Sequence, residues 1–210
     1  MTKFESFYEL LHGSESINHN SHFIDNCSGD QVGDWWTRVD AQGTGTATAN
    51  DAIDGGILIT TGATSADHTA IAFNDIRQYD WLNSIVIFNM NPTTADWSFG
   101  GFTNVANTDL SASTTSNIVV DTSHVAFYSL RSGDGTTNSI TSSTYTSVAE
   151  LHNHKIELLT SSSEYKVDDT LLVTKTTNLP IAKLQPIFGE RISGAGAESN
   201  IITYVEAYNK

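Results

Sequence analysis

The spacing of hydrophobic residues changes once along the chain, near residue 20. Before this point, Phe4, Phe7, Tyr8 and Leu11 follow the i, i+3, i+4, i+7 spacing of one helical face. A helix of about ten residues is marginal alone in water, so its aromatic face must dock on something. We therefore predict a short amphipathic helix and linker over residues 1–20, which either packs on its own domain or anchors the protein to a neighbouring subunit.

From residue 21 onward the period of the pattern is two, which is typical of β-strands with one buried face. Many short strands without a helical pattern between them predict an all-β, antiparallel, two-sheet fold in one domain, residues 21–210. The predicted strands cover residues 22–25, 35–41, 45–51, 55–62, 68–74, 82–91, 97–105, 116–121, 123–131, 154–161, 164–168, 170–175, 184–190 and 200–209.

Four of the segments after residue 21 allow a finer prediction. SIVIFNM and HVAFYSLR are apolar at nearly every position, as expected for central strands covered on both faces or for strands at an interface. Asp168 and Asp169 separate two strands by two residues and predict a hairpin turn, with a left-handed conformation at Asp169. Residues 133–147, GDGTTNSITSSTYTS, are predicted to form a polar loop.

Composition and charge narrow the choice of partners. The chain has 24 acidic and 10 basic residues, a formal net charge of −14, so the field of the protein would repel a phosphate backbone and nucleic acid is not expected as a partner. Cys27 is the only cysteine, so no internal disulfide can form. The sequence shows neither an apolar run of about 18 residues nor a secretory signal, so we expect synthesis in the cytoplasm and no membrane insertion.

The segment HKIELLTSSSEYKVDDTLLVTKTTNLPIAKLQPIFG, residues 154–189, resembles the late strands of laminin-G-like and concanavalin A-like jelly rolls. In those domains a strand runs into a "vDG"-type hairpin, a second strand returns, and a proline-marked segment leads to the next. Here Asp169 stands where Gly is common. NIITYVEAY is similar to their closing strand, which pairs near the beginning of the domain. The resemblance covers about residues 21–210 and implies a concanavalin A-like jelly-roll sandwich.

Such domains, when they carry an N-terminal arm and an acidic Ser/Thr/Asn-rich surface and lack an export signal, look like those of tailed-phage structural proteins. This resemblance implies a non-enzymatic virion protein: a capsid decoration, spike or tail fibre component that contacts other virion proteins or copies of itself. The expected location is the virion. The alternative is a carbohydrate-binding lectin module that contacts a cell-surface glycan.

An enzymatic function is not expected from the carboxylate pattern. Glucanases of this fold resemble one another in a Glu-x-Asp-x-x-Glu strand, whose alternate carboxylates project into the groove. That spacing does not occur in this chain, and Glu157 stands alone in KIELLT. Alginate lyases of this architecture use a Gln-x-His strand, which the nearest text, Arg77-Gln78-Tyr79, does not match.

Four tryptophans are candidates for a glycan-binding platform, since an aromatic ring can stack on the apolar face of a sugar. They are Trp35, Trp36, Trp81 and Trp97. Because successive side chains of a strand alternate between faces, one ring of the adjacent pair Trp35 and Trp36 must point away from the core. A sugar, an assembly contact or the N-terminal arm could each cover that ring.

No cofactor is expected, although two kinds of metal site were weighed. His19 with His22, and His152 with His154 on one strand face, could each reach a metal, but neither pair has an obvious third ligand, and hydrogen-bonded histidine is favoured. Calcium is a candidate at the acidic loops, where turn chemistry is the favoured explanation of the Asp residues. Those loops are 25–26, 50–54 and 132–135.

Overall fold

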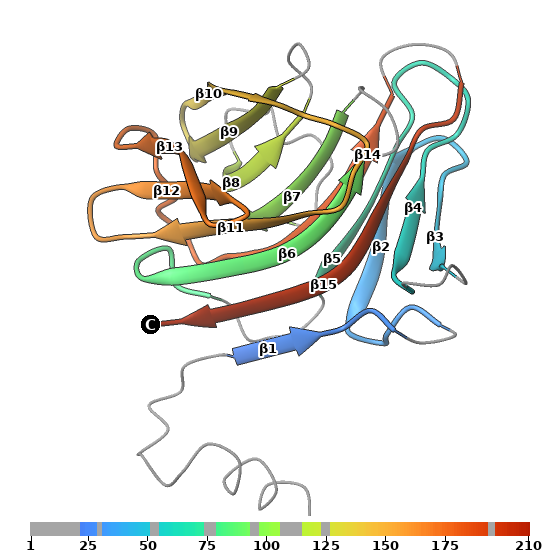
Figure 1. Ribbon diagram of the computed structural model, residues 1–210, viewed down its shortest axis with the longest axis horizontal. Helices are drawn as coiled ribbons and strands as arrows, with labels where there is room; N and C mark the ends of the chain where they lie inside the picture. Colours follow the sequence, from blue (N-terminus) through green and yellow to red (C-terminus); the bar gives the residue numbers. More distant parts are fainter. Residues whose placement is uncertain are drawn as a thin grey trace, which may run out of the picture.

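The computed structural model is a sandwich of two antiparallel sheets (Figure 1). It describes residues 22–28, 31–50, 55–73, 79–92, 97–105, 115–122, 127–192 and 196–210. The strands in these ranges are β1 (His22–Asp25), β2 (Trp36–Gln42), β3 (Thr46–Ala49), β4 (Ile57–Thr60), β5 (His68–Phe73), β6 (Ser84–Pro92), β7 (Trp97–Thr103), β8 (Ser116–Asp121), β9 (Phe127–Asp134), β10 (Asn138–Thr146), β11 (His152–Leu158), β12 (Ser163–Val167), β13 (Thr170–Lys175), β14 (Gln185–Arg191) and β15 (Ser199–Asn209).

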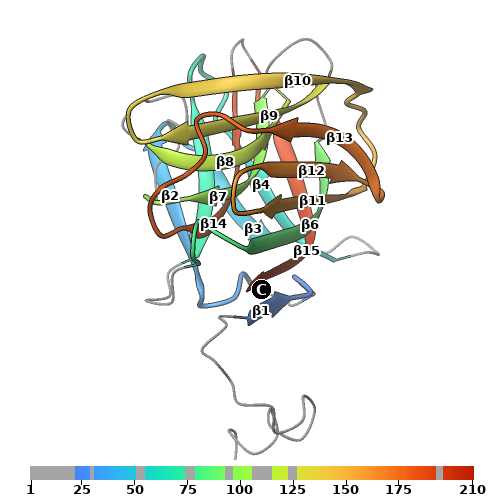
Figure 2. The same cartoon turned by 90° about the vertical axis from the view of Figure 1, so that its left-hand side faces the viewer.

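In both sheets, several neighbouring strands are far apart in the sequence. Sheet A runs β13-β12-β11-β6-β15-β4-β3, with β1 also paired to β15, and sheet B runs β10-β9-β8-β7-β14-β5-β2. Figure 2 shows the two as separate layers, with β11, β12 and β13 on one side and β7, β8 and β9 on the other. In Figure 1, the long strands β6 and β15 bend around β7, β8 and β9. Sheet B therefore lies on the inside of the bend.

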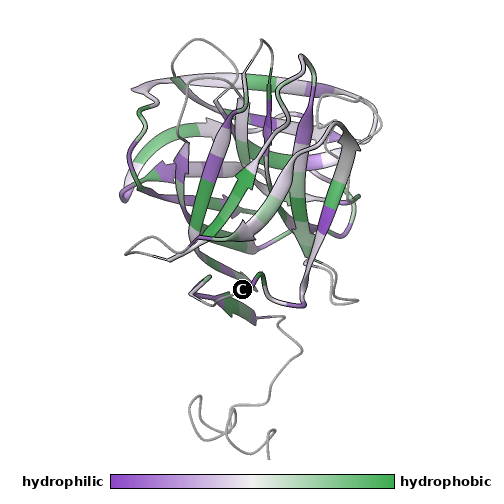
Figure 3. Ribbon diagram, turned by 90° about the vertical axis from the view of Figure 1, so that its right-hand side faces the viewer, coloured by the Kyte–Doolittle hydropathy of each residue, from purple (hydrophilic) through white to green (hydrophobic). Residues whose placement is uncertain are grey.

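The core lies between the two sheets and is rich in aromatic rings. Phe88 of sheet A meets Phe188 of sheet B with ring centroids 5.0 Å apart, and both side chains are fully buried. Contacts of this kind add about 0.5–1.5 kcal/mol to the free energy gained from burial alone. Green hydrophobic and purple hydrophilic stretches both occur along the strands in Figure 3.

The predicted all-β, two-sheet architecture is confirmed. The segment SIVIFNM lies in β6, and the described part of HVAFYSLR, from Phe127 onward, lies in β9. Both strands have neighbours on both sides in their sheets and are largely buried. The closing strand β15 pairs with β1, as the resemblance implies. The predicted turn is also confirmed, because Asp168 (φ 47°) and Asp169 (φ 64°) both adopt left-handed conformations. Within the described ranges, no helix is long and apolar enough to cross a membrane.

The prediction of a polar loop over residues 133–147 is wrong, because most of this segment forms β10. β10 is the edge strand of sheet B, and many of its residues are partly or fully exposed. Its Ser and Thr residues pair with β9, and Ser129 bonds Ser142 through hydroxyls 3.0 Å apart. The threonines suit a strand, but without alternating apolar residues the sequence carries no strand signal.

The predicted helix over residues 1–20, with Phe4, Phe7, Tyr8 and Leu11, lies outside the described residues. It therefore stays a prediction, as does its role in anchoring the protein to a neighbour.

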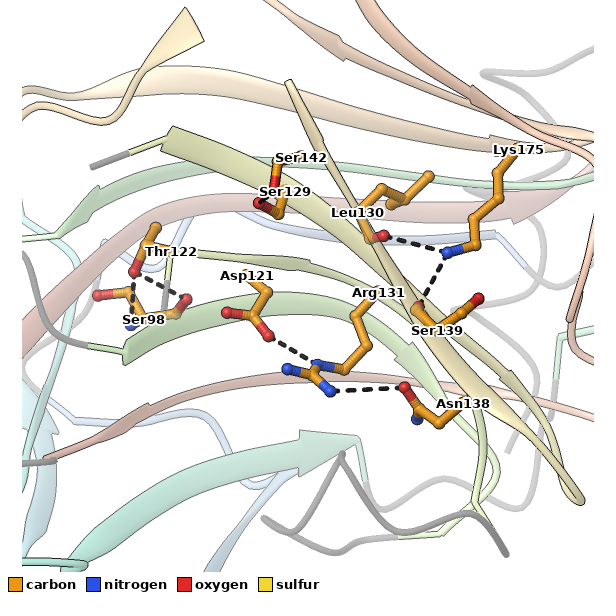
Figure 4. Close-up of polar contacts among 10 residues, drawn as sticks. All are labelled: Ser98, Asp121, Thr122, Ser129, Leu130, Arg131, Asn138, Ser139, Ser142 and Lys175. Carbon is orange, nitrogen blue, oxygen red and sulfur yellow. Dashed lines mark hydrogen bonds and ion pairs between the residues drawn. The ribbon is translucent and has the colours of Figure 1, made fainter. Parts of the chain in front are cut away.

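A buried lysine links the two sheets at one end. Lys175 of β13 donates hydrogen bonds to the carbonyl oxygens of Leu130 (3.4 Å) and Ser139 (2.8 Å), on β9 and β10 (Figure 4). Burial, together with the nearby positive charge of Arg131, lowers the pKa of Lys175 to about 8. The ammonium group thus satisfies carbonyl oxygens of sheet B from a strand of sheet A.

A buried histidine makes the stability of the sandwich depend on pH. His154 is fully buried between the rings of Phe88 and Tyr165, and its Nδ1 lies 2.9 Å from the Tyr165 hydroxyl. Burial, and secondarily the neighbouring His152, lower the pKa of His154 to about 3. The imidazole is therefore neutral in the folded protein at pH values where an exposed histidine would be charged.

We expect the free energy of unfolding to fall as the pH drops from about 6.5 towards 3, at about 1.4 kcal/mol per pH unit from His154 alone. In this window the unfolded chain binds a proton at His154 and the folded chain does not, so acid favours unfolding. Urea unfolding of the wild type and of His154→Gln at pH 7, 6, 5 and 4 measures the effect. The variant should lose less stability per pH unit, and equal slopes would contradict the assignment.

Candidate functional site

Sheet B has a second buried apolar cluster on the face turned away from the core. On β8, Ile118 and Val120 belong to the main core, whereas Val119 belongs to the second cluster. The other buried members of that cluster are Ala70, Ala72, Phe99 and Ile187. Because side chains alternate along a strand, Asn117 and Asp121 share the outer face of sheet B with Val119. This outer face lies on the inside of the bend seen in Figure 1.

A buried ion pair crosses the outer face between β8 and β9. The Nε of Arg131 donates to Asp121 at 2.7 Å, with side chains 10% and 1% exposed (Figure 4). The same guanidinium lies 3.4 Å from the Asn138 side-chain oxygen on β10. A buried charge is costly unless it is paired and hydrogen-bonded, and this pair meets both conditions. The guanidinium of Arg131 is therefore held in one position.

Trp97 lies beside two guanidinium groups on this face. The Cζ of Arg191 lies 4.2 Å from the centroid of the Trp97 ring, and the Cζ of Arg131 lies 5.7 Å from it. The strand register places Trp97 of β7 opposite Arg191 of β14, and Arg191 opposite His68 of β5. Directly paired residues project from the same face, so His68, Arg191 and Trp97 form a row across sheet B. All three side chains are partly exposed.

The carboxylates near this row determine which chemistry the face can carry. Glu190 is fully buried on the inner face, where the Ser98 hydroxyl donates to it. Among the described outer-face side chains of β5, β7, β8, β9 and β14, Asp121 is the one carboxylate. A two-carboxylate glycosidase mechanism needs a partner carboxyl about 5–10 Å away. The described part of this face therefore offers side chains that can bind a ligand, and a single carboxylate, Asp121, which is paired with Arg131.

The four predicted tryptophans are not brought together. Trp36 is 6% exposed and packs in the core, whereas Trp35 is 45% exposed, which confirms that one ring of the pair points outward. Trp36 pairs with Phe73 at the end of β5 remote from His68, so the Trp35 and Trp36 pair and Trp97 lie at opposite ends of sheet B.

The exposed Trp35 borders a hollow of about 250 Å³. Both Trp35 and Trp36 donate their indole N–H to one oxygen of Asp25, at 2.9 and 2.7 Å. The other lining residues of the hollow are Cys27, Ser28, Gln31, Gly33 and Ile57. Trp81 borders a separate hollow of about 290 Å³ beside the C-terminus. Burial raises the pKa of the Cys27 thiol well above its usual range.

Of the candidate metal sites, the pair His19 and His22 and the loop 50–54 extend outside the described residues and stay untested. Within the described residues, no three or more His, Cys, Asp and Glu side chains gather where they could hold an ion. Asp134 instead accepts hydrogen bonds from Thr136 and Thr137, which lower its pKa, and this is turn chemistry. His152 and His154 do share one face of β11, but the Nδ1 of His152 lies 2.7 Å from Asp168.

Sequence reasoning missed Arg131 and Arg191. Each is a charged residue in a strand that is otherwise buried, which is the signal that could have found it. Their position next to Trp97 depends on the register of β7, β9 and β14, which the sequence does not show.

Comparisons with solved structures identify the fold. A β-glucanase of Bacillus licheniformis matches with a TM-score of 0.63 and 13% identity, over 90% of this chain and 98% of the enzyme. A β-1,3-1,4-glucanase (lichenase) derived from a mouse hindgut metagenome matches with a TM-score of 0.61 and 12% identity, over 90% and 99%. A glycoside hydrolase family protein from Mycobacterium thermorestibile matches with a TM-score of 0.61 and 13% identity, over 88% and 99%.

These similarities show that the chain is a concanavalin A-like jelly-roll sandwich of the type found in glycoside hydrolases and lichenases. The predicted fold is thereby confirmed. No family model matches the chain. No curated protein sequence matches it either. At 12–13% identity, the likeness concerns the fold and does not extend to a substrate.

The prediction of a non-enzymatic virion structural protein is wrong. The similar structures that overturn it are glucanases, other glycoside hydrolases and a transglycosylase, and the likeness to them is one of fold. The error has a physical reason. An acidic, Ser/Thr-rich surface is only a property of composition, and a missing Glu-x-Asp-x-x-Glu pattern argues only against the one mechanism that uses it. Neither excludes action on sugars through other groups. The similar structures likewise overturn the expectation that the protein is not an enzyme.

We expect Asp121→Leu to lower the free energy of unfolding by about 3–5 kcal/mol, because the Arg131 guanidinium is then buried without its counter-charge. The double variant Asp121→Leu/Arg131→Met should be less destabilised, since it removes both charges. Urea unfolding of the two variants provides the comparison. A double variant that is less stable than the single one would show that the pair is not the source of the loss.

Proposed function

We propose that the protein is carbohydrate-active and binds a polysaccharide across the outer face of sheet B, at the end that carries Trp97. The observation that carries the proposal is the position of Trp97. Its ring is partly exposed on the face inside the bend of the sandwich and lies beside two guanidinium groups, at 4.2 and 5.7 Å.

The chemistry of this site suits a sugar. A pyranose ring presents C–H groups on its faces and hydroxyls at its edge, so it pairs an aromatic surface with hydrogen-bond donors. The part of Trp97 that stays exposed offers apolar surface, and the N–H groups of Arg191, whose Cζ lies over the ring, are donors next to it. Asp121 holds Arg131 in place before any ligand arrives, so less side-chain entropy is lost on binding.

Binding and cleavage are both within the carbohydrate-active class, and they depend on different groups. Binding needs the exposed row, whereas glycosidic cleavage needs an acid and a base or nucleophile at the scissile bond. The strand register places Asp121 opposite Phe99, two residues along β7 from Trp97. The proposed polysaccharide therefore passes close to this carboxylate.

The hollow beside Trp35 is a second surface on which a sugar could stack, and it supplies a matched control. Trp35 is more exposed than Trp36 but lies at the other end of sheet B from Trp97. The same Trp-to-Ala change at the two ends therefore separates the two surfaces.

We expect Trp97→Ala to weaken polysaccharide binding by about tenfold, the loss of one stacked aromatic contact. Trp35→Ala should change affinity by less than about twofold, because surface substitutions away from the site have small effects. Affinity electrophoresis through gels containing mixed-linkage β-glucan, laminarin, xylan or polygalacturonate gives the affinities. Assays for new reducing ends in the same mixtures detect cleavage independently of affinity.

Thermal unfolding of both variants checks that they are folded. Loss of binding in Trp35→Ala with no loss in Trp97→Ala would move the site to the hollow. A wild-type protein that neither binds nor cleaves any of these polysaccharides would overturn the proposal.

A further inference from the structure

We infer that the row formed by His68, Arg191 and Trp97 binds a sugar that bears an oxyanion, either the carboxylate of a uronic acid or a sulfate ester. This inference rests on the proposed function, because it concerns the same face of sheet B. It adds the chemical class of the ligand.

Arg191 differs from Arg131 in having no counter-charge among the residues that the structure describes. Arg131 is paired with Asp121 at 2.7 Å, and Asn138 lies within reach of its second nitrogen. Among the described residues, Arg191 has no carboxylate partner, and its recorded contact is the face of Trp97. The chain has 24 acidic residues and a net charge of −14, so most of its cations could find a carboxylate partner. A cation without one among the described residues is therefore unusual in this protein.

The contact with Trp97 leaves the guanidinium with hydrogen-bond donors for a ligand. The Cζ of Arg191 lies over the Trp97 ring, 4.2 Å from its centroid, which is the distance of a cation–π contact. The N–H donors lie in the plane of the guanidinium and point outward from its edge, where they can bind two oxygens of one carboxylate or sulfate. The contact with Trp97 also restricts the long side chain, which lowers the entropy cost of binding.

His68 adds a polar atom without a partner in the same row. Its Nδ1 lies 2.9 Å from the Ala66 carbonyl oxygen, which can only accept, so Nδ1 carries the proton. In the neutral ring, Nε2 is then an acceptor, and this buried atom has no hydrogen-bond partner among the described residues. A buried acceptor without a partner costs free energy, and a sugar hydroxyl would remove the cost once the atoms that cover Nε2 moved aside.

Together these three groups match the chemical groups of one acidic sugar. Arg191 provides two donors for an oxyanion, Trp97 an apolar surface for the ring, and His68 an acceptor for a hydroxyl. A neutral sugar would use Trp97 but would leave the charge of Arg191 unmatched. The row should therefore discriminate between acidic and neutral forms of one polysaccharide.

The test compares polysaccharides that differ only in charge. Polygalacturonate is paired with its carboxyl-reduced form, and a sulfated galactan with its desulfated form, so that the two pairs distinguish carboxylate from sulfate. We expect the wild type to bind at least one acidic form about tenfold more tightly than its neutral counterpart, the gain typical of a charge-assisted hydrogen bond. Poly-glutamate tests whether negative charge alone is enough, and it should bind weakly.

Arg191→Gln should abolish the preference for the acidic form. It should also weaken binding of the neutral form, which loses a hydrogen-bond donor, but by less than it weakens binding of the acidic form. Lys183→Gln removes the same charge from an exposed residue just before the opposite end of β14, and is the matched control. It should keep the preference. Trp97→Ala should weaken binding of both forms, which separates loss of the sugar site from loss of acid recognition.

Each outcome has one meaning. Equal binding of acidic and neutral forms by the wild type would overturn the inference and leave the proposed function standing. A preference that survives in Arg191→Gln but is lost in Lys183→Gln would place the anion site elsewhere. Tight binding of poly-glutamate would show recognition of charge rather than of an acidic sugar, and would also overturn the inference.

Discussion

The face of sheet B on which each β14 side chain lies depends on the side chain of Phe188 pointing into the sandwich. Phe188 is fully buried and contacts Phe88 across the core, and it also packs against Trp36 of β2. Once this residue of β14 points inward, alternation fixes Gly189 and Arg191 on the other face. A slip of one residue would exchange the two faces of the strand, so the aromatic core also sets the register of the surface.

Two glycines allow the rings on both faces of sheet B to pack closely. A Cβ on Gly189 would lie 2.2 Å from the Cζ of Phe99 on the outer face, and a Cβ on Gly100 would lie 2.8 Å from ring carbons of Phe188 and Phe88 on the inner face. Neither distance is compatible with a real side chain. The sheet is therefore covered by aromatic rings on both sides at this point, and any side chain here would displace one of them.

The sequence was sufficient to predict where the strands lie but not to predict the candidate site. The period of two located nearly all the strands, the Asp168-Asp169 pair located a hairpin, and the adjacency of Trp35 and Trp36 predicted one exposed ring. β10 was missed because its Ser and Thr residues lack apolar alternation. The row containing Arg191 could not be predicted, since it depends on the pairing of β7 with β14, strands far apart in the sequence.

The pairing of β1 with β15 determines where on the domain a tag or linker can be attached. It places the first and last described strands side by side, at the edge of Figure 1 opposite β9 and β10. Because His22 lies opposite Tyr208 in this pairing, groups attached to these two residues would emerge from the same region of the molecule.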